Sequence, residues 1–97
     1  MDEYFEIEGV TFVWNLNKSL ENFRKHKVTF EEATSAFMDP FLRVVDASPE
    51  DEARDAVIGM DERGKLLFVV HIAFEQENIR IISARKATRS ERHHYEE

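Results

Sequence analysis

The chain of 97 residues contains no cysteine, only three glycines and only two prolines. The absence of cysteine excludes disulfide bonds, thiolate zinc sites, iron–sulfur clusters and a cysteine nucleophile. The longest fully apolar stretch, Leu66 to Val70, is far shorter than the ~18 residues that a membrane-spanning helix needs. The acidic start Met1–Asp2–Glu3 lacks the basic region of a secretory signal. We therefore expect a soluble, cytoplasmic protein with no membrane partner.

Basic charge is also in short supply, because 20 acidic residues against 13 basic ones leave a net charge of −7. A negative field of this kind argues against tight nucleic-acid binding by the molecule as a whole. The charges are segregated, however. Residues 31–62 hold ten acids and two bases, whereas residues 18–27 hold four bases and one acid, and residues 80–92 hold five bases and one acid. Since screening acts over about 8–10 Å, the two basic segments can act locally as one patch if the fold brings them together.

The first elements are predicted from periodicity. Residues 10–14 alternate with Val10, Phe12 and Trp14 on one side, which predicts a strand. Asn15 is a good N-cap for a helix that follows at once. In that helix the spacing i, i+4, i+7 indicates one buried face, made by Leu16, Leu20 and Phe23.

A second helix is predicted from the capping-box sequence Thr29–Phe30–Glu31–Glu32, with Phe30, Ala33 and Phe37 inward and an end before Pro40. The period then changes to that of strands, expected at residues 42–45, 54–60, 65–74 and 79–84, with 65–74 central. A polar C-terminal helix is expected beyond residue 85. These elements predict one domain, residues 1–97, with an α+β fold: a small antiparallel sheet, two N-terminal helices and a C-terminal helix.

The first helix carries one candidate functional cluster. Lys18, Asn22 and Lys25 fall on one stripe opposite the apolar face, and His26 lies beside them near the C-terminus of the helix, where the dipole favours cations. Two ammonium groups, an amide and an imidazole on one face suit a phosphodiester. A solvated polar face explains the same residues more simply, and on this segment alone it is the favoured interpretation.

The second cluster lies in the sequence from Arg80 to Arg89. By strict alternation Arg80 shares its strand face with Ile82, whereas Ser83 and Arg85 point to the other side. Arginine held on a strand can bind a phosphate with two parallel hydrogen bonds. An edge strand protected by charge is an equally good interpretation.

Other polar residues carry weaker signals. His71 shares a strand face with apolar residues, so we expect a hydrogen-bonded core residue rather than a ligand. The acidic run Glu50–Asp51–Glu52 lacks the glycine and the spacing of a calcium loop and is expected to be solvated. Glycine-rich phosphate loops and metal-binding motifs are absent from the sequence, so no cofactor and no metal are predicted.

Several short motifs follow one another in a fixed order between about residues 10 and 95. They are Phe12–Val13–Trp14–Asn15, Lys18, Asn22, Lys25–His26, Phe30–Glu31–Glu32–Ala33, Phe37, Asp39–Pro40, Arg54 four residues ahead of Ile58–Gly59, Gly64, Leu66 to His71, Ile79 to Ala87, Glu91 and Tyr95. In their joint order and spacing the chain resembles the BrnT family, the toxin components of bacterial type II toxin–antitoxin pairs.

This resemblance implies a RelE-like fold and a ribonuclease that arrests translation. It also implies an antitoxin partner with a ribbon-helix-helix DNA-binding domain, a complex of two toxins with two antitoxins, and repression of the operon by that complex, so that operator DNA is contacted only through the antitoxin. One position departs from the family pattern, because Lys27 stands where glycine usually follows Lys-His. We therefore expect the first helix to end differently and to displace His26.

RNA cleavage without a metal needs a base for the 2′-hydroxyl, cations for the phosphorane and an acid for the 5′-oxygen. The sequence does not decide between histidine and lysine as the proton carrier. An alternative is an inert interaction domain that binds the antitoxin and tunes repression. The candidate catalytic residues are Lys25, His26, Arg54, Arg80 and Arg85, and the candidate RNA-binding residues are Lys18, Asn22, Ser83 and Lys86.

Overall fold

A computed structural model describes residues 1–49, 53–74 and 78–97 and begins with a hairpin that the sequence analysis did not predict in full. Its first strand, β1 (Asp2–Ile7), pairs antiparallel with β2 (Val10–Asn15). Five of the six residues of β1 are exposed, so the strand has no apolar alternation that could have revealed it. Glu8 and Gly9 both have positive φ, as a two-residue hairpin turn requires.

The remaining elements agree with the predicted order of two helices, four strands and a final helix. They are α1 (Leu16–His26), α2 (Phe30–Ala36), β3 (Arg43–Asp46), β4 (Asp55–Met60), β5 (Leu66–Phe74), β6 (Asn78–Lys86) and α3 (Arg89–Glu96). The α+β class is therefore confirmed. The acidic run at residues 50–52 and residues 75–77, between the third and fourth predicted strands, lie outside the described residues.

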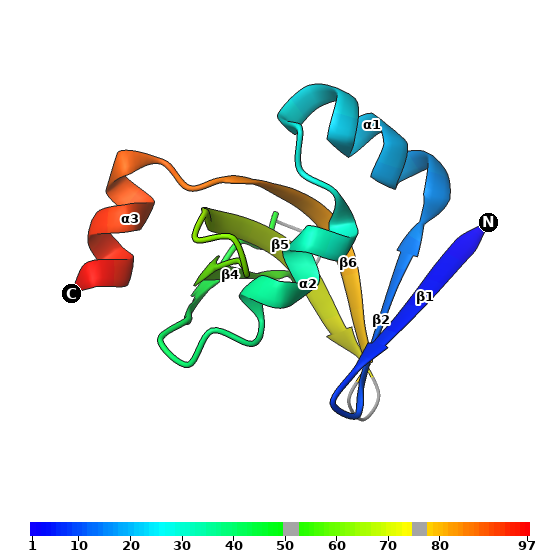
Figure 1. Ribbon diagram of the computed structural model, residues 1–97, viewed down its shortest axis with the longest axis horizontal. Coiled ribbons are helices and arrows are strands. Elements are labelled where there is room, and N and C mark those ends of the chain that lie inside the picture. The colour runs from blue at the N-terminus through cyan, green and yellow to red at the C-terminus, as the bar shows by residue number, and fades with distance from the viewer. Residues whose placement is uncertain (50–52, 75–77) are drawn as a thin grey trace.

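The sheet is mixed, and the prediction of a purely antiparallel sheet is wrong at one pairing. Its strand order is β1-β2-β6-β5-β4-β3. β2 runs parallel to β6 (Figure 1). After β2 the chain passes through α1, α2, β3, β4 and β5, and it then enters β6 in the same direction in which it left β2. The parallel pairing covers only Thr11–Val13 and Asn78–Arg80, so among the described residues no strand lies on that side of the second half of β6.

One face of the sheet is covered by α2, which Figure 1 shows lying across it. Phe30 and Ala33 are fully buried there with Phe12, Trp14 and Ala36, as predicted. The third residue predicted to point inward, Phe37, is partly buried against the same core. Both hydrogen bonds of the predicted capping box between Thr29 and Glu32 are present. At Gly59 of β4 an added Cβ would lie 2.5 Å from the carbonyl oxygen of Ala36, so glycine is what permits this close packing.

The predicted buried face of α1 is wrong. Leu20 and Phe23 are 57% and 47% exposed, whereas Asn22 is the buried residue of this helix, at 6%. The reason is the neighbour that α1 meets, which is the unpaired edge of β6 rather than an apolar sheet face. A strand edge presents N–H and C=O groups, and these need a polar partner.

The expectation that Lys27 would end α1 differently is also wrong. Lys27 adopts the left-handed conformation with φ 60° and ψ 26°, and its N–H donates to the carbonyl of Phe23. His26 therefore remains the last helical residue. The conformation is costly for a residue with a Cβ, and the Lys27 ammonium lies 5.8 Å from the ring centroid of Phe23.

We expect the substitution Lys27→Gly to stabilise the fold by about 0.5–1 kcal/mol, because glycine adopts this backbone conformation without strain. Urea unfolding of the two proteins at equal salt measures the difference. A lower unfolding midpoint for Lys27→Gly would mean that the contact between Lys27 and Phe23 outweighs the backbone strain.

His71 is a hydrogen-bonded core residue, as predicted. It is 6% exposed, and its Nδ1 lies 3.2 Å from the carbonyl oxygen of Val69. Its ring packs edge-on against that of Phe37, with 4.9 Å between the two ring centroids. Burial lowers the pKa of His71 below its ordinary value of 6.5. The neutral imidazole is therefore the form that the folded state favours.

Stability should consequently fall as the pH drops below about 6.5, because the unfolded chain then binds a proton at His71 that the folded chain does not bind. Above that pH the residue is neutral in both states and contributes no pH dependence. Urea unfolding between pH 8 and 5 tests this. A His71→Phe variant should be flat over the same range, and an equally steep decline in that variant would refute the assignment.

None of the helices in the described parts of the chain has the length and apolarity needed to cross a lipid bilayer.

Candidate functional site

A shallow hollow of about 220 Å³ lies between α1 and β6 and joins the two clusters that the sequence analysis proposed. Five of the nine candidate residues line it. The lining consists of Lys18, Glu21, Asn22, Lys25 and His26 from α1 with Ile82 and Ser83 from β6. Two separate basic segments of the chain thus meet at one place on an acidic molecule.

A β-bulge places the strand arginines differently from the prediction. Val70 pairs with Ser83, but the next residue, His71, pairs with Ile81, so Ile82 is an extra residue in β6. Strict alternation had put Arg80 and Arg85 on opposite faces, and this is wrong. Arg80, Ser83 and Arg85 pair with Ile72, Val70 and Phe68, which alternate along β5, so all three share one face.

This shared face brings both arginines close to the hollow. At about 3.3 Å per residue, the Cα atoms of Arg80 and Arg85 lie within about 10 Å and 7 Å of that of Ser83, which is itself in the lining. The register of β6 thus places both strand arginines near the α1 residues that line the hollow, and a single cationic site remains a prediction.

Arg80 forms an ion pair with the first strand. Its guanidinium nitrogens lie 2.9 and 3.4 Å from the two carboxylate oxygens of Asp2. The hydrogen bond from Arg80 lowers the pKa of Asp2, and the carboxylate raises the pKa of Arg80 in return. About a third of each side chain is exposed, so a solvent-borne anion can reach the pair.

Arg85 is held more firmly. Both its terminal nitrogens donate to the carboxylate of Glu91 in α3, at 2.8 and 2.9 Å, and its guanidinium lies 4.3 Å from the centroid of the Phe68 ring. The hydrogen bond from Arg85 lowers the pKa of Glu91. Glu91 also closes the capping box of α3 with Thr88, so one carboxylate orients both the helix and the arginine.

The two guanidinium groups are thus already bound in the two-pronged geometry that they would use for a phosphate. In this state the partner of Arg80 is the carboxylate of Asp2, and the partner of Arg85 is the carboxylate of Glu91. Sequence reasoning identified neither as part of the site. The Thr88–Glu91 capping-box pattern is a signal that could have pointed to Glu91, whereas Asp2 lies in the strand that was missed.

Asn22 lies in the lining, yet its amide is occupied by backbone. Its two N–H bonds donate to the carbonyl oxygens of Ala84 (2.8 Å) and Val28 (3.0 Å), and its oxygen accepts the Ala84 N–H (3.1 Å). The side chain therefore substitutes for a neighbouring strand at the edge of β6. It builds the hollow and has no free N–H for a ligand.

Arg54 and Lys86 lie outside the lining. Arg54 immediately precedes β4, and its backbone N–H and carbonyl form hydrogen bonds with the Ser48 hydroxyl. The next residue, Asp55, pairs with His71 of β5, which pairs with Ile81 of β6. Arg54 therefore lies two strands, about 10 Å, from β6. Lys86 is exposed and pairs with Leu67, on the face opposite the strand arginines. Neither residue lines the hollow, and their roles remain predictions.

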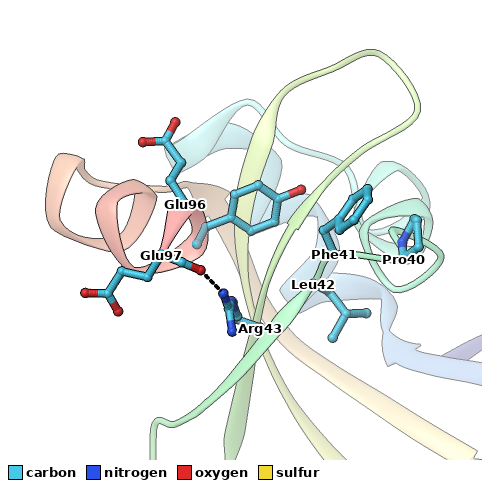
Figure 2. Close-up of a pocket in the computed structure, with 7 residues that line it drawn as sticks. Pro40, Phe41, Leu42, Arg43, Glu96 and Glu97 are labelled. Carbon is cyan, nitrogen blue, oxygen red and sulfur yellow. Dashed lines mark hydrogen bonds between the residues drawn. The ribbon is translucent and has the colours of Figure 1, made fainter.

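A larger hollow of about 530 Å³ lies elsewhere, between the segment Pro40–Arg43 and the end of α3. Figure 2 shows Arg43 turned toward the main-chain oxygen of Glu97, with the carboxylates of Glu96 and Glu97 pointing outward. Tyr95 donates to Asp39 at 2.5 Å, and this bond raises the pKa of Tyr95 to about 12. With two carboxylates and one guanidinium, this hollow does not suit a polyanion.

The family model described as "Ribonuclease toxin, BrnT, of type II toxin-antitoxin system" matches residues 14–91. Among solved structures, the chain is similar to the Brucella abortus ribonuclease toxin BrnT, with a TM-score of 0.61 and 22% sequence identity over 78% of this chain and 94% of that chain. At that identity the likeness shows a shared fold. No curated protein matches the sequence.

Proposed function

The chain belongs to the BrnT family of ribonuclease toxins of type II toxin–antitoxin systems, and from this membership we propose that it is a RelE-like endoribonuclease that works without a metal and arrests translation in the cytoplasm. The observation that supports this most directly is the hollow between α1 and β6. It combines Lys18, Lys25 and His26 with a strand that carries Ser83 between two arginines. That combination suits a bound phosphodiester.

The proposed chemistry assigns each group a role. Arg80 and Arg85 bind the non-bridging oxygens and stabilise the extra charge of the phosphorane, after exchanging their carboxylate partners for the phosphate. Lys18 and Lys25 add positive charge from α1. His26 or Lys25 removes the proton from the 2′-hydroxyl, and the other returns a proton to the 5′-oxygen. Arg54 and Lys86 would contact RNA that extends beyond the hollow.

Membership of a type II system implies an antitoxin partner. We propose that this antitoxin has a ribbon-helix-helix DNA-binding domain, that two toxins and two antitoxins form the complex, and that the toxin meets operator DNA only through the antitoxin. An acidic antitoxin segment would neutralise the basic segments 18–27 and 80–92 by complementary charge. A gel-shift experiment with the isolated toxin should accordingly show no specific operator complex.

The test of the enzymatic proposal is cleavage of a model RNA by protein freed of antitoxin through unfolding and refolding. We expect cleavage with and without EDTA, and growth arrest when the chain is expressed alone. Loss of cleavage in EDTA would refute metal independence. The ion pairs of Asp2 with Arg80 and of Glu91 with Arg85 favour one alternative, an inert domain that binds the antitoxin and tunes repression. The absence of cleavage by the refolded protein would support that alternative.

A further inference from the structure

The outer side of α1 is apolar although nothing in the described residues covers it. The helix has a well-defined apolar stripe, which usually faces a protein core. Here the stripe is turned outward, with Leu20 57% and Phe23 47% exposed, while the opposite side of the helix packs on β6 through Asn22. Figure 1 shows α1 at the outside of the molecule. Adjacent exposed apolar side chains at helical spacing mark an interaction surface.

The rim of this stripe is basic. Arg24 and Lys27 lie on this side of α1, whereas Lys18, Lys25 and the one acid of residues 16–27, Glu21, lie on the opposite side and line the hollow. Lys27 is positioned beside the stripe, with its ammonium 5.8 Å from the Phe23 ring centroid. The chemistry of the surface is thus an apolar centre with positive surroundings.

We propose that the outer face of α1, formed by Leu20, Phe23, Arg24 and Lys27, binds an acidic amphipathic segment of the antitoxin. This inference rests on the proposed function, since it takes the antitoxin to be the partner. Apolar side chains of the segment would cover Leu20 and Phe23, as in the helix-in-groove mode of recognition, and its carboxylates would meet Arg24 and Lys27.

Two other occupants fit less well. In a symmetric dimer of this chain the same basic surface would face itself, and like charges would repel. RNA could stack on Phe23, but Leu20 offers no aromatic face, and the hollow that we propose for a phosphodiester lies on the other side of the helix. An antitoxin segment satisfies both the apolar and the charged parts of the surface.

The position of this surface also explains how a single segment could silence the site. Lys18 and Lys25 on the same helix line the hollow, and a helix with its side chains is only about 10–12 Å across. A partner anchored on the outer face therefore needs few further residues to reach the hollow and cover its cations.

The test compares two double variants in their binding to the antitoxin, purified from the co-expressed complex. Leu20→Ser/Phe23→Ser changes the outer face of α1. Phe41→Ser/Val44→Ser is the matched control, because these side chains are 73% and 58% exposed and lie in β3 and the segment before it, three strands away from β6. We expect the first to raise the Kd at least 30-fold, as for a central aromatic anchor, and the control to change it less than 3-fold.

A second variant tests the charged rim. Arg24→Gln/Lys27→Gln should slow association and weaken its dependence on salt between 0.05 and 0.5 M NaCl. Equal effects of the two serine variants, no effect of the first, or a larger effect of the control would overturn the proposal. A loss of RNA binding by the first variant with unchanged antitoxin binding would also overturn it, by assigning this face to RNA.

RNA cleavage by the free variants separates this inference from the proposed function. Leu20 and Phe23 lie outside the hollow, so cleavage by Leu20→Ser/Phe23→Ser should equal that of the parent protein, with circular dichroism as the control for folding. If the parent protein cleaves no RNA, the enzymatic proposal fails, and the binding comparison still decides whether α1 holds the antitoxin.

Discussion

Replacing Arg80 or Arg85 by alanine should slow the cleavage of a model RNA by about 10²–10³-fold, the loss expected when one contact to the charge of the transition state is removed. Both guanidinium groups lie on the strand face that carries Ser83, and each is held in a two-pronged geometry. A strand holds such groups more rigidly than a helix end does. Antitoxin assembly should be largely retained.

The carboxylate partners provide matched controls. Asp2→Asn and Glu91→Gln break the same two ion pairs but leave the arginines in place. If the arginines act on RNA, these controls should cleave at least as fast as the parent protein, because each guanidinium is then free to take a phosphate. If Arg85 only anchors α3, Glu91→Gln should lose as much activity as Arg85→Ala. Rates like those of the parent protein in both arginine variants would refute the assignment.

His26 is expected to contribute less if lysine carries the proton. His26→Ala and Lys25→Ala, assayed beside the arginine variants, compare the two residues directly. A loss in His26→Ala as large as in the arginine variants would identify histidine as the proton carrier.

The substitution Asn22→Ala should destabilise the fold by about 3 kcal/mol or more, because it leaves three buried backbone groups, each costing about 1–3 kcal/mol, without their partners. These groups are the carbonyl and N–H of Ala84 and the carbonyl of Val28. A loss of this size is a large share of the ~5–15 kcal/mol that typically stabilises a domain.

Asn17→Ala is the control for this experiment, because Asn17 is exposed on the same helix. Urea unfolding of both variants and the parent protein gives the free energies of unfolding. We expect Asn17→Ala to lie within about 0.5 kcal/mol of the parent, as surface substitutions generally do. Equal stabilities of the two variants would contradict the structural role of Asn22.

Local signals in the sequence were sufficient for most of the secondary structure. The capping box at Thr29 and Glu32, the alternation around Phe12 and the apolar run of β5 each depend on neighbouring residues, and each formed as expected. The exposed edge strand β1 was missed because a strand without a buried face has no apolar period.

The errors in the candidate site have a different origin. Periodicity shows which side of α1 is apolar, but not that the helix meets a strand edge, where the amide of Asn22 is needed and Leu20 is not. Alternation likewise cannot reveal one extra residue in β6, and that residue decides whether Arg80 and Arg85 share a face. Both facts arise from tertiary pairing between segments far apart in the chain.

The pairing of β2 with β6 has a consequence for the timing of protein synthesis. Phe12 and Trp14 belong to the same core as Ile81 and Ala84, and the Asn22–Ala84 hydrogen bond spans 62 residues. Contacts of such long sequence separation form late and slow the folding of a chain. A nascent chain that has not yet emerged from the ribosome as far as β6 has neither a closed core nor an assembled hollow. If the chain cleaves RNA as we propose, the ribosome must therefore finish most of it before the product can act.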